Sequence, residues 1–125
     1  MNSERNPVGW FEIYVDDLER ARRFYEATFV VKLAELPSPT VKMLAFPMQP
    51  DVPGACGALV KYEGKNAGAG GTIIYFGCDD CAVEAARAAA NGGQIFKEKF
   101  SIGPYGFISL VFDSEKNMIG LHSRK

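Results

Sequence analysis

One stretch decides the fold of this chain, and the chain contains it twice. Residues 11–29 read FEIYVDDLERARRFYEATF, and residues 73–93 read IIYFGCDDCAVEAARAAANGG. In each copy an alternating strand pattern ends at two aspartates, and a helical pattern follows. The aspartate pairs, at 16–17 and 79–80, lie 63 positions apart in a chain of 125 residues. An internal repeat of about half the chain predicts two similar modules.

The strand of the first copy has two different faces, because successive side chains of a strand point to opposite sides. One face carries Phe11, Ile13 and Val15, and the other carries Trp10, Glu12 and Tyr14. In the second copy the apolar face consists of Ile74, Phe76 and Cys78. We expect the apolar faces to pack beneath the helices. A carboxylate between two aromatic rings is not typical of a solvated surface.

Two helices are predicted, over residues 17–29 and 80–91. Asp16 is a suitable N-cap for the first helix, and Glu19 completes a capping box three residues later. The apolar stripe of this helix consists of Leu18, Ala21, Tyr25 and Phe29. The second helix is rich in alanine, and Asn91-Gly92-Gly93 marks its end.

Strand patterns follow each helix, so both modules are expected to have the order β-α-β-β-β. The predicted strands cover 30–36, 40–46 and 57–62 in the first module, and 94–100, 107–113 and 118–123 in the second. A turn at 114–117 joins the last two. We predict an α+β fold in a single domain, 1–125, with module one at 7–63, a linker at 64–71 and module two at 72–123. With one helix on each sheet, the free faces should meet in a curved sheet around a cavity.

Composition excludes several classes of function. The chain is 47% hydrophobic and 23% charged, with a net charge of −1, so nothing indicates a nucleic-acid or membrane-surface partner. No apolar run approaches the roughly 20 residues of a membrane span. The start, MNSERNPVG, has no apolar signal region, so we expect a cytoplasmic protein.

The three cysteines do not indicate a secreted disulfide framework. Cys78-Asp79-Asp80-Cys81 has the spacing and placement of a thioredoxin-like redox motif. Against a redox function, Cys78 falls on the buried face of its strand, and the two aspartates oppose formation of a thiolate. The same aspartates are explained as caps of the helix.

The repeat, together with the ending GPYGFISLVFDSEKNMIGLHS at 103–123, resembles the vicinal oxygen chelate superfamily of glyoxalases, bleomycin-resistance proteins and extradiol dioxygenases. The resemblance covers almost the whole chain. It implies a sheet that curls around a cavity, with the helices outside, and a homodimer. It also implies that Trp10, Glu12 and Tyr14 face the cavity.

Enzymes of this superfamily hold a divalent metal with His and Glu side chains at four positions. The resemblance places these positions at Trp10, at Ile73 or Thr72, at Lys61 or Val60, and at Gly120. None of these side chains is a usual metal ligand. We therefore predict no metal and no other cofactor at the family site.

Glu12 is the first candidate for a catalytic residue. In a cavity of low polarity its carboxyl pKa would rise, which suits a general acid or base. Alternatively it is a structural partner of Lys61, expected on the same face. Lys61 could also meet an anionic group of a ligand. His122, the only histidine, is either a proton donor or acceptor on the cavity face, or an idle residue near the C-terminus.

The other candidates are ligand contacts. Tyr14 and Tyr75 could stack on a flat ligand or donate a hydrogen bond to it, or they could simply pack. Tyr105, in the loop GPYGF at 103–107, is a further candidate unless that loop is only a tight turn. With Trp10 and Ile73, these residues predict a pocket for a small aromatic or apolar organic compound.

The sequence therefore leaves two functions open, beside a third interpretation, an interaction domain whose cavity is vestigial and filled by Trp10. The first is a metal-free binding protein for such a compound. The second is a lyase, an isomerase or a dioxygenase-type enzyme that uses Glu12 as acid or base, or an atypical divalent metal site.

Overall fold

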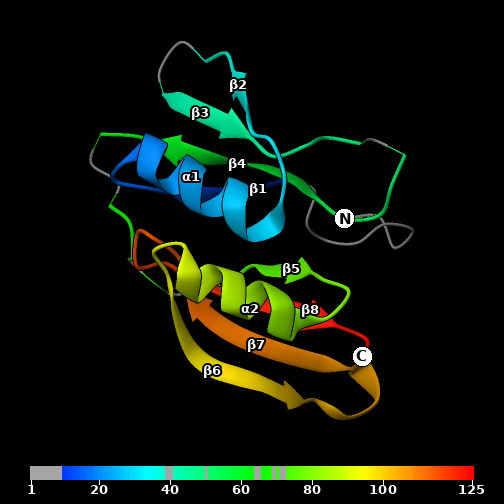
Figure 1. Cartoon of the computed structure of the whole chain (residues 1–125). Coiled ribbons are helices and arrows are strands. Elements are labelled where there is room, and N and C mark those ends of the chain that lie inside the picture. The colour runs from blue at the N-terminus through cyan, green and yellow to red at the C-terminus, as the bar shows by residue number, and fades with distance from the viewer. Residues whose placement is uncertain (1–9, 39–40, 50, 64–65, 69, 71–72) are drawn as a thin grey trace.

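Two modules of the same design build the chain, as Figure 1 shows for the computed structural model. The structure describes residues 10–38, 41–49, 51–63, 66–68, 70 and 73–125. Thr72 and the predicted module starts at residues 7 and 72 lie outside these residues. The module boundaries stay a prediction.

Each module has one helix and four strands. The first contains β1 (Trp10–Tyr14), α1 (Leu18–Phe29), β2 (Ala34–Leu36), β3 (Lys42–Ala45) and β4 (Cys56–Lys61). The second contains β5 (Tyr75–Gly77), α2 (Cys81–Ala90), β6 (Gln94–Ser101), β7 (Phe107–Phe112) and β8 (Met118–Ser123), with a short 3₁₀ helix, η1 (Gly103–Tyr105), between β6 and β7. The predicted α+β fold of two β-α-β-β-β modules is confirmed.

The strands form two mixed sheets with equivalent strand orders, β1-β4-β3-β2 and β5-β8-β7-β6. In each sheet the first strand lies at the edge and runs parallel to the last strand of its module. The helices α1 and α2 contact each other and lie on the same side of the molecule (Figure 1). No strand pairing joins the two sheets within the described residues, so the curved sheet is not closed into one ladder.

Each aspartate pair supplies the N-cap of its helix. In the first copy the N-cap lies one residue later than predicted. Asp17, not Asp16, is the N-cap of α1, and its side chain accepts a hydrogen bond from the Arg20 N–H at 3.0 Å. Asp16 instead accepts from the Ala67 N–H at 3.2 Å, which ties the helix start to the linker. Asp80 caps α2. That helix ends before Asn91, as the sequence predicts.

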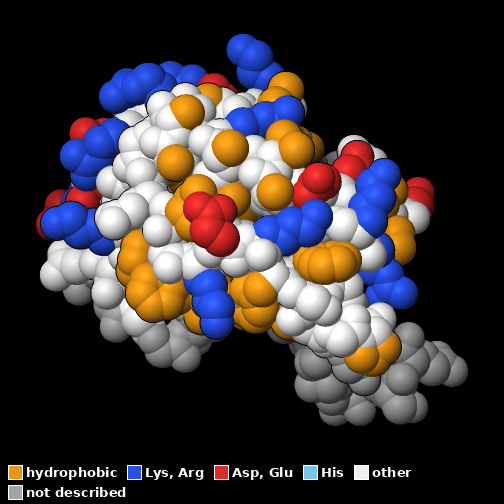
Figure 2. All heavy atoms as spheres, turned by 60° about the horizontal axis from the view of Figure 1, so that its bottom comes forward, with side chains coloured by type: hydrophobic (Ala, Val, Ile, Leu, Met, Phe, Trp, Pro, Cys, Tyr) orange, Lys and Arg blue, Asp and Glu red, His pale blue; other side chains and the backbone are white. Residues whose placement is uncertain are grey.

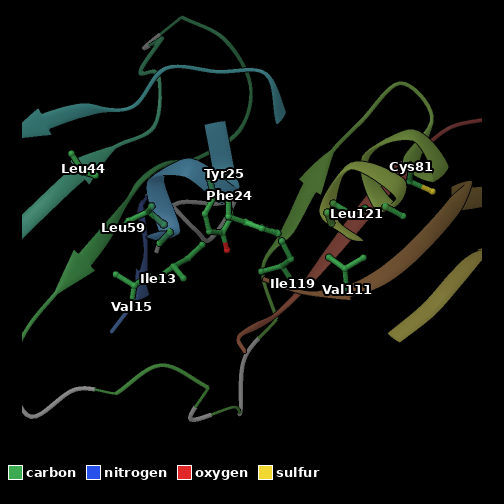
Figure 3. Packing of buried hydrophobic residues seen from close by; sticks show 13 residues of the cluster. Ile13, Val15, Phe24, Tyr25, Leu44, Leu59, Cys81, Val111, Ile119 and Leu121 are labelled. Atoms are coloured by element: carbon green, nitrogen blue, oxygen red, sulfur yellow. The ribbon is translucent and has the colours of Figure 1, made fainter. Parts of the chain in front are cut away.

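The apolar faces lie under the helices, as expected. Ile13 and Val15 are buried, and one cluster joins both modules. Figure 3 shows Tyr25 of α1 between the buried residues of the first module and those of the second. The rings of Phe29 and Phe76, one from each module, stack at 4.7 Å between centroids. Burial of these rings supplies a hydrophobic contribution that holds the modules together.

A polar connection between the modules is made by the 113–117 turn, which joins β7 to β8. The Glu115 side chain is fully buried and forms two hydrogen bonds with the Arg20 guanidinium, at 2.6 and 2.8 Å. It also accepts from the backbone N–H groups of Asp16 and Asp17, at the start of α1. A carboxylate at a helix N-terminus is favoured by the helix dipole as well as by these hydrogen bonds.

The second carboxylate of the turn, Asp113, holds the turn itself. Asp113 accepts from the Tyr25 hydroxyl at 2.6 Å and from the backbone N–H groups of Glu115 and Asn117 at 2.8 Å. Burial raises the pKa of Asp113, and these hydrogen bonds act in the opposite direction. Burial also raises the pKa of Tyr25, with a further rise from the nearby Asp113 charge. The turn is therefore held by several hydrogen bonds and docked on the first module.

The surface shows no single dominant feature on the face drawn in Figure 2. Lys and Arg side chains alternate there with Asp, Glu and apolar ones, and neither sign of charge forms a continuous patch. Within the described residues, neither helix is long and apolar enough to cross a membrane.

Candidate functional site

A cavity of about 510 Å³ lies where the two modules meet. Its walls come from β1, from described residues between 66 and 74, and from the 113–117 turn with the strands on either side of it. We refer to it as the junction cavity. The apolar part of the wall includes Ile73, Ile74, Phe112 and Met118, and the polar part consists of Glu12, Tyr14, Asn66, Lys116 and Asn117.

Asn117 connects the three segments that form this cavity. Its side-chain N–H donates to the Tyr14 carbonyl oxygen at 3.0 Å and to the Asp113 carboxylate at 3.1 Å. Its side-chain oxygen accepts from the Gly68 N–H at 2.6 Å. Because β1, the linker and the turn share one amide side chain, the cavity is largely pre-formed.

Glu12 lies on the predicted face, between Trp10 and Tyr14. One carboxylate oxygen accepts from the Trp10 indole N–H at 3.2 Å, and the other accepts from the Tyr14 hydroxyl at 2.8 Å. The hydrogen bond to Glu12 raises the pKa of Tyr14, and burial adds to the rise. Glu12 itself is exposed, so the expected burial of its carboxylate in a low-polarity environment is wrong.

Lys61 does not share the face of Glu12, and this part of the sequence interpretation is wrong. In the parallel pairing of β1 with β4, Tyr14 pairs with Val60 and Ile13 pairs with Leu59. Val60 therefore lies on the Glu12 face. Lys61, one residue further, lies on the opposite face with the core residue Leu59. The structure does not bring Lys61 into the junction cavity or into an ion pair with Glu12.

The same pairing corrects one of the four family metal positions. Tyr75 of β5 pairs with Gly120 of β8, and Glu12 of β1 pairs with Ala58 of β4. Tyr75 occupies the same place in the second repeat as Glu12 in the first. The residue of the first module that is equivalent to Gly120 is therefore Ala58, and the third metal position moves from Lys61 or Val60 to Ala58. Ala58 is fully buried and has no donor group.

The residues at the family metal positions do not fit a metal. Trp10, Ile73 and Ala58 lack a suitable donor atom, and at Gly120 any side chain would collide with the Tyr75 ring. Elsewhere in the described part of the chain, no three His, Cys, Asp or Glu residues are grouped so that they could hold a metal ion.

Two predicted site residues meet in a different place. Tyr75 and His122 line a second cavity of about 460 Å³ with Gly77, Ile102 and Ile108. This second-sheet cavity lies on the face of β8 that points away from α2, since Ile119 and Leu121 are buried in the core. His122 therefore points to the predicted side. The predicted residues are divided between two cavities, with Glu12, Tyr14 and Ile73 in the junction cavity.

Trp10 is among the lining residues of neither cavity. Trp10 is 38% exposed and reaches the junction cavity only through its hydrogen bond to Glu12. Tyr105 belongs to η1, in the loop between β6 and β7, and its side chain lies outside what the structure describes.

Lys116 and Asn117 were not predicted as site residues, because the pattern at 114–117 indicates only a turn. Four polar residues between two strands carry no signal that they reach a segment near residue 68. Lys116 has one unusual feature, a backbone φ of 69°, which is rare for residues other than glycine. That feature is visible only in the structure.

The two thiols of the cysteine motif are in environments that disfavour the thiolate form or limit access. Cys78 and Cys81 are free thiols, and Cys81 is fully buried. Burial raises the pKa of Cys78 to about 12, with a further rise from the nearby Glu84 carboxylate. At neutral pH this thiol is therefore protonated and a poor nucleophile.

The sequence matches one protein family over residues 8–121, and this family is described as the Glyoxalase/Bleomycin resistance protein/Dioxygenase superfamily. No curated protein matches the sequence significantly.

Solved structures show the same fold at low sequence identity. Glyoxalase I from Zea mays superposes with a TM-score of 0.74 at 19% identity, over 94% of this chain and 46% of that one. The hypothetical protein SA1046 from S. aureus has a TM-score of 0.72 at 16% identity, over 95% of both chains. A glyoxalase/bleomycin resistance protein from Albidiferax ferrireducens T118 has a TM-score of 0.66 at 22% identity, over 95% of this chain and 100% of that one.

Proposed function

We propose that this chain, which belongs to the Glyoxalase/Bleomycin resistance protein/Dioxygenase superfamily, binds a small aromatic or apolar organic compound in its junction cavity. The observation that carries the proposal is the cavity itself. It brings Glu12, Tyr14 and Ile73, three residues predicted from the sequence, together with an apolar wall from the second module.

The size and chemistry of the cavity support a small organic ligand. A volume of about 510 Å³ lies within the range of ligand pockets, which is roughly 300–1,000 Å³. Such pockets are mainly apolar and have a few fixed polar groups. Here the apolar wall is interrupted by the hydrogen-bonded pair of Glu12 and Tyr14. A ring system would lie against the isoleucine and methionine side chains.

A second candidate function, an enzyme of the lyase, isomerase or dioxygenase type, is favoured by one observation. Glu12 and Tyr14 are joined at 2.8 Å on the cavity wall, where a proton could be exchanged with a ligand. The residues at the family metal positions do not support a metal-dependent version of this function. Glu12→Gln separates the two functions, because it should abolish turnover of a substrate but leave the cavity able to bind its apolar part.

The single tryptophan provides a direct test of binding. Trp10 donates its indole hydrogen bond to Glu12, which lines the cavity, so a ligand there should alter the Trp10 emission. The probe is N-phenylnaphthylamine, a neutral compound in which an amine joins a phenyl ring to a naphthalene. We expect saturable quenching of Trp10, and we expect Ile73→Asp to weaken it by placing a charge in the apolar wall.

A control variant is Ile102→Asp, which changes the second-sheet cavity instead. If Ile102→Asp weakens binding and Ile73→Asp does not, the compound binds in the other cavity and the proposed position is wrong. If the wild-type protein shows no saturable quenching, the proposed function is wrong. The homodimer and the cytoplasmic location stay predictions.

A further inference from the structure

Lys116 has a backbone conformation that favours glycine, and nothing in the turn requires a lysine at this position. Its φ of 69° lies in the left-handed region, which glycine adopts without a steric penalty. The turn is held by groups other than its side chain. The Asp113 N–H donates to the Asn117 carbonyl at 2.8 Å, and the Lys116 N–H donates to the Asp113 carbonyl at 3.2 Å. A glycine would therefore serve the turn equally well.

No ion pair within the described part of the chain accounts for the Lys116 side chain. Lys116 is exposed. Strained residues that stabilise nothing locally tend to occur at functional positions. Lys116 lines the junction cavity, and its backbone and Cβ lie next to Gly68, which also lines it.

The charges in the cavity wall are arranged asymmetrically. Glu12 and Lys116 are the two charged side chains in its described part. Both carboxylate oxygens of Glu12 already accept hydrogen bonds from Trp10 and Tyr14. The Lys116 ammonium has no such carboxylate partner in the described structure. A negative group on a ligand would be attracted to Lys116 and repelled by Glu12. These charges would orient the ligand with its negative group toward Lys116.

We propose that Lys116 binds the anionic group of an organic monoanion, whose apolar body occupies the junction cavity. The body lies against Phe112, Met118 and Ile73, and a carboxylate or sulfonate forms an ion pair with the ammonium. This inference rests on the proposed function and narrows its ligand class. It also replaces Lys61, the lysine that the sequence favoured, with a lysine that lies at the cavity.

The test compares two dyes that have the same aromatic rings and differ in charge. Anilinonaphthalene sulfonate carries one negative charge, whereas N-phenylnaphthylamine is neutral. The measured quantity is the ratio of their dissociation constants in wild-type protein and in Lys116→Gln. We expect the preference for the anion to fall about fivefold in this variant, the size of a partly exposed ion pair. Affinity for the neutral dye should stay the same.

Two further variants make the comparison specific. Lys61→Gln removes the same charge from a face outside the cavity, so its dye preference should equal that of the wild type. Lys116→Gly removes the ammonium and relieves the backbone strain, so it should lose the preference while its melting temperature rises. If Lys116→Gln loses the preference for the anionic dye because it unfolds, Lys116→Gly, which should stay folded, still tests whether the ammonium is needed.

The outcomes separate the two proposals. If both dyes bind but Lys116→Gln leaves the preference unchanged, or if Lys61→Gln lowers it equally, the role of Lys116 is wrong and the proposed function stands. If neither dye binds the wild-type protein, the proposed function fails and this inference fails with it.

Discussion

Two hydrogen bonds make Glu12 a fixed acceptor between Trp10 and Tyr14. The unusual face of β1 is therefore a connected set of side chains. The alternation of the strand predicts that the three share a face, but it does not predict the hydrogen bonds between them. The position of Lys61 was not predictable in the same way. A shift of one residue in register moves a side chain to the other face, and the alternation within β4 does not determine its register with β1.

Lys116 leads to a prediction about stability at the residue scale. A left-handed backbone costs an ordinary residue about 1 kcal/mol, and glycine avoids this cost but gains entropy in the unfolded chain. We expect Lys116→Gly to raise the free energy of unfolding by up to about 1 kcal/mol. Urea denaturation checks this, with Lys116→Ala as the control because alanine keeps the strain. An equal fall in stability in Lys116→Gly and Lys116→Ala would contradict this, because it would show that the lysine side chain stabilises the fold.

At the scale of elements, the 113–117 turn connects the modules. Its sequence predicts a turn, but the partners of Glu115 lie at Asp16, Asp17 and Arg20, about 95 to 99 positions away. No local pattern indicates contacts over such separations. The same holds for the junction cavity, since the turn brings Lys116 and Asn117 to it. The elements could thus be predicted, and their contacts could not.

Glu115→Gln should weaken this connection. The variant loses the charge that binds Arg20 and the start of α1, and hydrogen bonds to a charged group contribute about 2 kcal/mol. We expect a loss of about that size in the free energy of unfolding at neutral pH. Glu19→Gln is the control, because Glu19 also pairs with an arginine but is exposed.

The loss of unfolding free energy in Glu115→Gln should become smaller as the pH falls. Burial alone would raise the pKa of Glu115, but hydrogen bonds from Arg20, the Asp17 N–H and Ser114 outweigh it and hold the pKa below its ordinary value. The unfolded chain therefore takes up this proton first as pH falls. The contribution of Glu115 is complete above about pH 4.5 and disappears as pH falls through the lower, folded-state value. A difference between wild type and Glu115→Gln that grows toward acid pH would contradict this assignment.

At the scale of the whole molecule, the repeat made the fold predictable. Two equal modules with equal aspartate caps require the same strand order, and the structure has it. The division of the site could not be predicted in the same way. Glu12 and Tyr75 are counterparts in the repeat, yet they line different cavities. Among the described residues, the 113–117 turn and linker residues 66, 68 and 70 line the first cavity and not the second.

The homodimer stays a prediction from family resemblance. Light scattering at micromolar concentration should give a particle of about twice the chain mass of 13.7 kDa. A particle of the mass of one chain, at every concentration tested, would show that the protein is a monomer.

Adding metal ions tests whether the residues at the metal positions of the family can bind a metal. Ni²⁺, Zn²⁺ or Mn²⁺ should not raise the melting temperature, because an ion without a native binding site gives no stabilisation by linkage. A variant without the single histidine, His122→Ala, controls for weak binding at that side chain. A metal-dependent rise that persists in His122→Ala would show that the protein holds a metal after all.

The central claim is that the junction cavity binds an organic ligand, and methyl NMR tests it most directly. Isoleucine methyl groups report on both cavities at once. Those of Ile13, Ile73, Ile74 and Ile119 lie at the junction cavity, those of Ile102 and Ile108 lie at the second-sheet cavity, and Ile95 belongs to neither. On titration with anilinonaphthalene sulfonate, we predict saturable ring-current shifts at the first group and none at Ile95, Ile102 or Ile108. Shifts confined to Ile102 and Ile108, or no shifts in any of the seven, would contradict the account.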